Sequence, residues 1–192
     1  MYLFSLGDGI ELKVMKPEND QALFALVESN REHLRQWLPW VERQKTLEDC
    51  QQFLKSLEEH FVNNKAMHCG IWLKGKLVGV VGMDRIDWPN KTAEIGYWLG
   101  KGQEGKGLVT KCCRFLVEFA FMELKLNRLE IRCAPGNLRS RGIPERLGFT
   151  IEGRLKEAEW LYDHFEDHVF YALLAEEWKE NHDPKDEIIP RG

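Results

Sequence analysis

The stretch TAEIGYWLGKGQEGKGLVT, residues 92–110, decides the fold. Apolar residues alternate with other residue types in its first half: Ala93, Ile95, Tyr97 and Leu99 against Glu94, Gly96 and Trp98. This alternation predicts a β-strand. The glycine-rich segment GKGQEGKG follows, and apolar residues then recur at the spacing of a helix. The stretch therefore predicts a strand, a glycine-rich turn and a helix in direct succession.

The glycine-rich turn is a candidate phosphate site. Gly105 and Gly107 allow a positive φ and a close approach of a ligand to the backbone. The following helix start offers unpaired N–H groups and a partial positive charge, which suit a phosphate. Lys106, Lys111 and Arg114 add positive charge. The spacings of the P-loop and of the dinucleotide fingerprint are both absent. An ordinary strand-to-helix turn explains the same glycines, so both interpretations stay open at this point.

The rest of the chain interleaves strands and helices. The patterns predict helices before residue 62, after residue 108 and near 138–146, and further strands at 10–15, 67–73, 77–83, 128–134, 148–153 and 168–175. Thr46 and Asp49 predict a capping box at the start of the second early helix. This order predicts an α/β (α+β) fold, with a mixed central sheet of about six to seven strands and flanking helices.

Size and charge limit the class of protein. The 192 residues predict one domain, residues 1–180, followed by a polar tail at 181–192. Lys and Arg number 27 against 31 Asp and Glu, a formal charge of −4, so we expect no direct nucleic-acid partner and no membrane partner. Five cysteines without a CxxC pair favour a reduced, cytoplasmic protein. His164 and His168 are spaced by four but do not form an HExxH motif, so no metal is expected.

From Glu94 to Phe149 the chain resembles the GNAT acetyltransferase superfamily, and within it the RimJ/RimL-like ribosomal-protein N-terminal acetyltransferases. The resemblance is carried by AEIGYWL, GQEGKG and NLRSRGIPERLGF, with further support from HLRQWLPW and EAEWLYDHFEDHVFYALL. It implies a GNAT fold and an N-acetyltransferase that uses acetyl-coenzyme A without a metal. The acceptor that it implies is the N-terminal α-amine of a protein, in particular a basic ribosomal protein.

The resemblance also implies which residues bind the cosubstrate. They lie at the strand end, in the turn and before a later helix: Tyr97, Trp98, Leu99, Gly105, Lys106, Gly107, Leu108, Val109, Thr110, Asn137 and Ser140. In the family's Q/R-x-x-G-x-G/A pattern, Glu104 replaces Gln or Arg and Val109 replaces a small residue. Because an acidic side chain beside a phosphate is unfavourable, we expect the contacts to come from backbone amides.

Two carboxylates compete as the base that takes the proton of the amine. The resemblance places the base of the ribosomal-protein branch at Glu159 and that of other branches at Glu94, and Glu159 is favoured. It gives Ser140 the role of hydrogen-bonding the coenzyme A sulfur and protonating the thiolate. Helix capping also explains Asn137 and Ser140. On the substrate side the resemblance places Trp37, Trp40 and Glu94.

Two other functions stay open. One is acetylation of a small amine, such as a polyamine, an amino acid or an antibiotic. The other is a non-catalytic acyl-coenzyme A binding or sensor module, which the departures at Glu104 and Val109 keep open. The sequence does not decide between a monomer and a homodimer.

Overall fold

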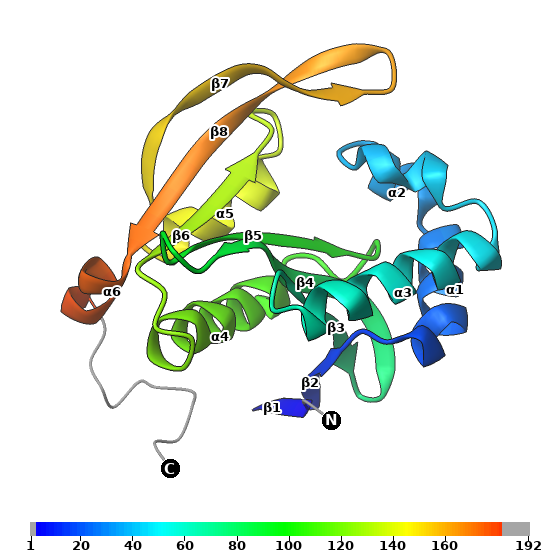
Figure 1. Cartoon of the computed structure of the whole chain (residues 1–192). Coiled ribbons are helices and arrows are strands. Elements are labelled where there is room, and N and C mark those ends of the chain that lie inside the picture. The colour runs from blue at the N-terminus through cyan, green and yellow to red at the C-terminus, as the bar shows by residue number, and fades with distance from the viewer. Residues whose placement is uncertain (1–2, 182–192) are drawn as a thin grey trace. The chain divides into compact units, whose positions relative to one another are not determined.

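The computed structural model describes residues 3–181, so the predicted tail at 181–192 lies outside them except for Asn181. Its strands form one sheet in the order β1-β2-β3-β4-β5-β6-β8-β7 (Figure 1). The strands are β1 (Leu3–Gly7), β2 (Ile10–Val14), β3 (Met67–Leu73), β4 (Lys76–Asp87), β5 (Thr92–Leu99), β6 (Arg128–Cys133), β7 (Thr150–Leu161) and β8 (His164–Leu174). The helices are α1 (Asp20–Glu28), α2 (Arg31–Arg35), α3 (Leu47–Val62), α4 (Leu108–Met122), α5 (Leu138–Arg146) and α6 (Ala175–Asn181), with the short 3-10 helices η1 (Pro17–Asn19) and η2 (Pro39–Arg43).

The predicted mixed α/β fold with flanking helices is confirmed. β5 and β6 pair in parallel, whereas β1 with β2, β2 with β3, and β8 with β6 and β7 pair antiparallel. The sheet has eight strands rather than six to seven. The strand that was missed is β1, which turns back into β2 through Gly7-Asp8-Gly9, three residues that all have positive φ.

The chain divides into two compact units. Unit 1 comprises the chain up to Gly82 together with Tyr97–Val109, and unit 2 comprises Met83–Gly96 and the chain from Thr110 onward. Three elements, β4, β5 and α4, pass from one unit into the other along the chain.

Unit 1 has a hydrophobic core built by its helices and strands. The core residues are Met15, Leu23, Val27, Leu34, Val41, Cys50, Leu54, Leu57, Leu77 and Val80. The predicted capping box of α3 is confirmed, because the Asp49 N–H donates to Thr46 Oγ1 over 3.1 Å and the Thr46 N–H donates to Asp49 Oδ2 over 2.9 Å. β3 and β4 are neighbours in the sheet and are joined by Lys74 and Gly75, with φ of 50° and 80°, as in a β-hairpin.

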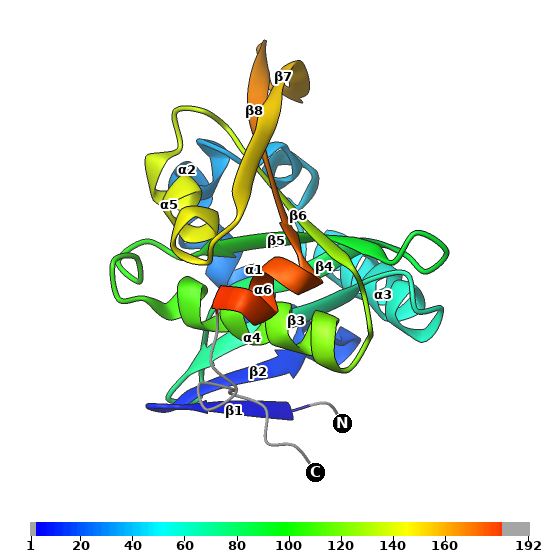
Figure 2. The same cartoon turned by 90° about the vertical axis from the view of Figure 1, so that its left-hand side faces the viewer.

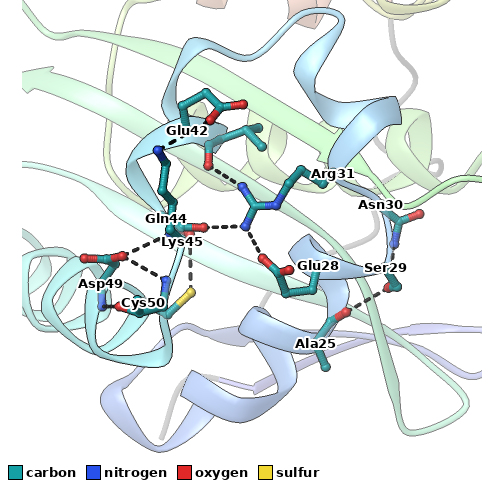
Figure 3. Close-up of polar contacts among 12 residues, drawn as sticks. Ala25, Glu28, Ser29, Asn30, Arg31, Glu42, Gln44, Lys45, Asp49 and Cys50 are labelled. Carbon is teal, nitrogen blue, oxygen red and sulfur yellow. Dashed lines mark hydrogen bonds and ion pairs between the residues drawn. The ribbon is translucent and has the colours of Figure 1, made fainter.

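Arg31 fixes the irregular segment between α2 and α3 (Figure 3). Its Nη1 donates to the Val41 carbonyl over 2.8 Å and its Nη2 to the Gln44 carbonyl over 2.7 Å. The same guanidinium pairs with Glu28 at the end of α1. The Cys50 thiol in turn contacts Gln44 Oε1 at 3.4 Å. One side chain thus ties this segment to the end of α1.

In unit 2, β6 lies between β5 and β8, with Ala93 opposite Leu129 and Ile131 opposite Tyr171. These four residues point to one face and are all buried. Helix α4 from Thr110 onward and the whole of α6 belong to this unit, and the two helices lie side by side (Figure 2). The Arg114 guanidinium of α4 lies 5.8 Å from the centre of the Trp178 ring of α6. The opposite face carries the polar side chains of the site described below.

β7 and β8 form a long hairpin (Figure 1). The sequence predicts strands at 148–153 and 168–175, and each predicted strand is shorter than the observed one. The reason is that β7 is exposed along almost its whole length, so its apolar and polar residues do not alternate.

No helix between residues 3 and 181 is long and apolar enough to cross a bilayer. The five cysteines all fall in this range, and each is buried and forms no disulfide.

Candidate active site

The glycine-rich turn of unit 1 has the backbone conformation that glycine favours. Gly105 and Gly107 have φ of 75° and 72°, and α4 begins at the next residue, Leu108. No described atom lies within 4 Å of a Cβ built on either glycine. The glycines are therefore required by the backbone conformation, and the space beside the turn is open. An exposed turn that leads into a helix N-terminus suits a pyrophosphate.

Hydrogen bonds from Asn30, which lies between α1 and α2, and from β4 hold the start of this turn. Asn30 Oδ1 accepts the Lys101 N–H over 2.7 Å, and Asn30 Nδ2 donates to the Leu26 carbonyl over 2.7 Å. The Gly100 N–H donates to the Val78 carbonyl over 2.9 Å. The turn is thus fixed by residues that are distant in sequence.

Glu104 is engaged by its own turn and by α2. Its Oε2 accepts the Gly102 N–H over 2.6 Å, and its Oε1 lies 3.3 Å from His33 Nε2. Only 22% of the Glu104 side chain is exposed. The acidic residue that departs from the family pattern therefore stabilises the turn. His33 was not among the predicted site residues.

The tryptophans proposed for the substrate side lie in unit 1. Trp40 and Trp98 meet with ring centroids 5.5 Å apart and planes tilted by 50°. Both rings pack against the hydrophobic core of the unit. Trp37 is half-buried just after α2, and Tyr97 and Leu99 are half-buried at the end of β5. Core packing therefore accounts for at least part of this aromatic set.

Asn137 and Ser140 come together at the start of α5 in unit 2. Asn137 Oδ1 accepts the Ser140 N–H over 3.1 Å, so Asn137 caps the helix. Ser140 Oγ lies 3.2 Å from Cys133 Sγ at the end of β6. Cys133 was not predicted for the site, because the contact joins two elements separated by a turn.

Glu94 is held between two guanidinium groups in unit 2. Its Oε2 lies 3.0 Å from Arg85 Nη1 and 3.5 Å from Arg132 Nε. Burial raises the pKa of the Glu94 carboxyl, and the two guanidiniums oppose this rise. Arg132 also reaches Glu130, and Arg128 joins Glu130 to Glu152, so Glu94 belongs to a chain of ion pairs that runs from Arg85 to Glu152.

Glu159 lies on β7, next to a histidine of β8. Its Oε2 is 3.5 Å from His168 Nε2, and 34% of the Glu159 side chain is exposed against 15% of that of His168. His168 was considered only as a metal ligand from the sequence. Among residues 3–181, no three His, Cys, Asp or Glu side chains cluster in a way that could hold a metal ion.

The strand registers place Glu94 and Glu159 on the same face of the sheet of unit 2. Glu94 pairs with Glu130, Glu130 with Ala172, and Glu159 with Glu166. With strands about 4.8 Å apart and about 3.3 Å per residue, the two carboxylates are roughly 14 Å apart across the strands and roughly 20 Å along them. They therefore cannot serve the same proton.

The chain matches the acetyltransferase (GNAT) domain family over residues 10–150. It therefore belongs to the GNAT acetyltransferase family, and the identification made from the sequence is confirmed. The ribosomal-protein-serine acetyltransferase of Escherichia coli (strain K12) is 30% identical over 171 residues, which are 89% of this chain and 96% of that protein.

Two solved structures share the fold at similar coverage. RimL, a ribosomal L7/L12 α-N-protein acetyltransferase solved with coenzyme A, has a TM-score of 0.88 at 26% identity and covers 92% of this chain and 99% of its own. The microcin C7 self-immunity acetyltransferase MccE, solved with acetyl-coenzyme A and AMP, has a TM-score of 0.83 at 31% identity and covers 88% and 94%. Acetyl-coenzyme A is thus the cosubstrate of this family.

Proposed function

We propose that this chain transfers an acetyl group from acetyl-coenzyme A to the N-terminal α-amine of a ribosomal protein in the cytoplasm. The observation that carries this proposal is the kinship, over almost the whole chain, with acetyltransferases named for ribosomal proteins. An α-amine loses its proton at a pKa of about 7.7–8.0, against about 10.4 for a lysine. A carboxylate base is therefore better matched to an α-amine.

In the proposed reaction, Glu159 takes the proton that the amine loses as its nitrogen bonds to the acetyl carbon. The bond between that carbon and sulfur breaks, and the Ser140 hydroxyl hydrogen-bonds the thiolate and relays a proton to it, taking one from water in return. The contacts of the two candidate bases support this choice. Glu94 is paired with two guanidiniums, at 3.0 and 3.5 Å, whereas Glu159 contacts a histidine at 3.5 Å and 34% of its side chain is exposed.

The turn residues Gly105–Val109, with Thr110, are proposed to bind the pyrophosphate through their backbone amides. The positive φ of both glycines and the open space beside them fit this role. The Glu104 carboxylate accepts the Gly102 N–H within the turn. The proposed phosphate contacts therefore come from the backbone amides and not from this side chain.

A small-molecule amine is the second candidate acceptor. The relative MccE, 31% identical with 88% of this chain covered, is named for self-immunity to microcin C7 and not for a ribosomal protein, and its structure also contains AMP, a small molecule. For this acceptor class the roles of Glu159 and Ser140 would be unchanged.

Release of free thiol from acetyl-coenzyme A by the full chain distinguishes these acceptors. We expect release with peptides that begin with a free serine or alanine, and none with the same peptides blocked at the N-terminus. Mass spectrometry should locate the acetyl group on the first residue. Turnover with polyamines, amino acids or amine antibiotics alone would favour the second candidate. Coenzyme binding without turnover of any amine would contradict an enzymatic role.

The roles of Glu159 and Ser140 are tested by substitution. Glu159→Gln and Ser140→Ala should each lower kcat by about 10²-fold or more, because each removes an acid–base group. Glu152→Gln is the matched control, since Glu152 is a β7 carboxylate in a surface ion pair with Arg128, and kcat should stay within about twofold. If Glu94→Gln lowers kcat by this amount and Glu159→Gln does not, the base is Glu94.

A further inference from the structure

The pairing of β7 with β8 is interrupted beside Glu159. Leu155 lies opposite His168 and Glu159 opposite Glu166, so three residues of β7 face a single residue of β8. The inserted residues are Lys156, Glu157 and Ala158, and the β8 residue is Asp167. Glu157 has a φ of 49°, a conformation that non-glycine residues rarely adopt.

This bulge determines where Glu159 lies along the hairpin. Without the two extra residues, Glu157 would face Glu166 and Glu159 would face His164 near the turn. Because two residues span about 7 Å of strand, the bulge moves Glu159 by that distance away from the turn. The shift is by an even number of residues, so Glu159 keeps its face and reaches His168, 3.5 Å away.

Asp167 makes the polar contacts that hold the bulge. Its Oδ1 accepts the Glu157 N–H over 2.7 Å, and its Oδ2 accepts from Arg154 Nε over 2.6 Å. The Asp167 side chain is 22% exposed, against 61% for that of Arg154. A bulge leaves backbone groups without their partners in the ladder, and here the carboxylate replaces such a partner.

We propose that Asp167 is a positioning residue, which holds the bulge at Glu157 and thereby places Glu159 where it acts as the base. This inference rests on the proposed role of Glu159. The hydrogen bonds from the Glu157 amide and from Arg154 hold the pKa of Asp167 below its usual value, so its carboxylate is charged at neutral pH.

The test compares Asp167→Ala and Asp167→Asn with the wild-type full chain. Asp167→Ala should lower kcat by about 10²-fold through misplacement of the base, with an unchanged KM for acetyl-coenzyme A. Asp167→Asn keeps an oxygen that can accept the Glu157 N–H, so its loss should be clearly smaller. Asp87→Ala is the matched control, because Asp87 accepts the Asn90 N–H in another turn, and its kcat should not change.

A double variant separates this inference from the proposed function. If Asp167 acts through Glu159, adding Asp167→Ala to Glu159→Gln lowers kcat no further. Two results would overturn the inference. In the first, the losses in kcat of the two single variants multiply in the double variant. In the second, Asp167→Ala keeps its kcat although Glu159→Gln loses it. An unchanged kcat in Glu159→Gln would overturn the proposed base instead.

Two further readouts test the bulge itself, and the first of them does not depend on Glu159 being the base. Hydrogen exchange of the Glu157 amide should accelerate in Asp167→Ala, and an unchanged rate would contradict the role of Asp167 in the bulge. Adding Glu157→Gly to Asp167→Ala should restore part of kcat, because glycine adopts a positive φ readily. No recovery in a folded double variant counts against the inference.

Discussion

Gly107 shows at the scale of one residue what the turn before α4 requires. An alanine there would keep the φ of 72° only with strain, although its methyl group would meet no described atom within 4 Å. Gly107→Ala should therefore lower the free energy of unfolding by about 1–2 kcal/mol in urea titrations. Gly153→Ala is the control, because that methyl group is also unopposed and φ there is not positive. Equal losses in both variants would contradict a conformational cause.

Individual residues also mark the limit of what the sequence predicts about the site. The glycine pair and its helix are evident from spacing alone. The contacts of Glu104 with His33 and of Lys101 with Asn30 are not evident from spacing. The Lys101–Asn30 contact, for example, joins residues 71 positions apart. The Cys133–Ser140 contact is equally hidden, since no local pattern of residue types encodes it.

At the scale of an element, the capping box of α3 leads to a prediction of stability and its pH dependence. Thr46→Ala should lower the free energy of unfolding by about 1 kcal/mol, because the Asp49 N–H loses its acceptor. Hydrogen bonds from Thr46 and Lys45 hold the pKa of Asp49 below its usual value.

The sign of the pH effect follows from this lowered pKa. The unfolded chain binds a proton at Asp49 at a higher pH than the folded chain does, so stability is lost as the pH falls through the folded pKa. Unfolding titrations of wild type and Asp49→Asn should therefore differ at neutral pH and converge below the usual aspartate pKa of about 3.9. Parallel curves would contradict this assignment.

Elements with one buried face were predicted well, and those without one were not. α5 lies at Leu138–Arg146, where the sequence predicts it, and β6 agrees within a residue. β7 was predicted at less than half its length, because its charged residues and two bulges remove the alternation that identifies a strand. The part of the fold nearest Glu159 is thus the part with the weakest pattern.

At the scale of the whole molecule, we propose that residues 1–180 unfold as one domain. β4, β5 and α4 each pass from one unit to the other, so neither unit has all of its elements to itself. Calorimetry should show one transition with equal calorimetric and van't Hoff enthalpies, and two resolved transitions would contradict one domain.

Acetyl-coenzyme A at 100 times its Kd should add about 2.7 kcal/mol to the free energy of unfolding.

The bulged hairpin has a consequence for the solubility of the protein. β7 ends the strand order of the described sheet, and a long exposed edge strand invites pairing with another chain. The bulges after Ile151 and Leu155, together with the charges of Arg154 and Lys156, make this edge a poor template for such pairing. We therefore expect the irregularity on β7 also to protect concentrated solutions of the protein against aggregation by sheet extension.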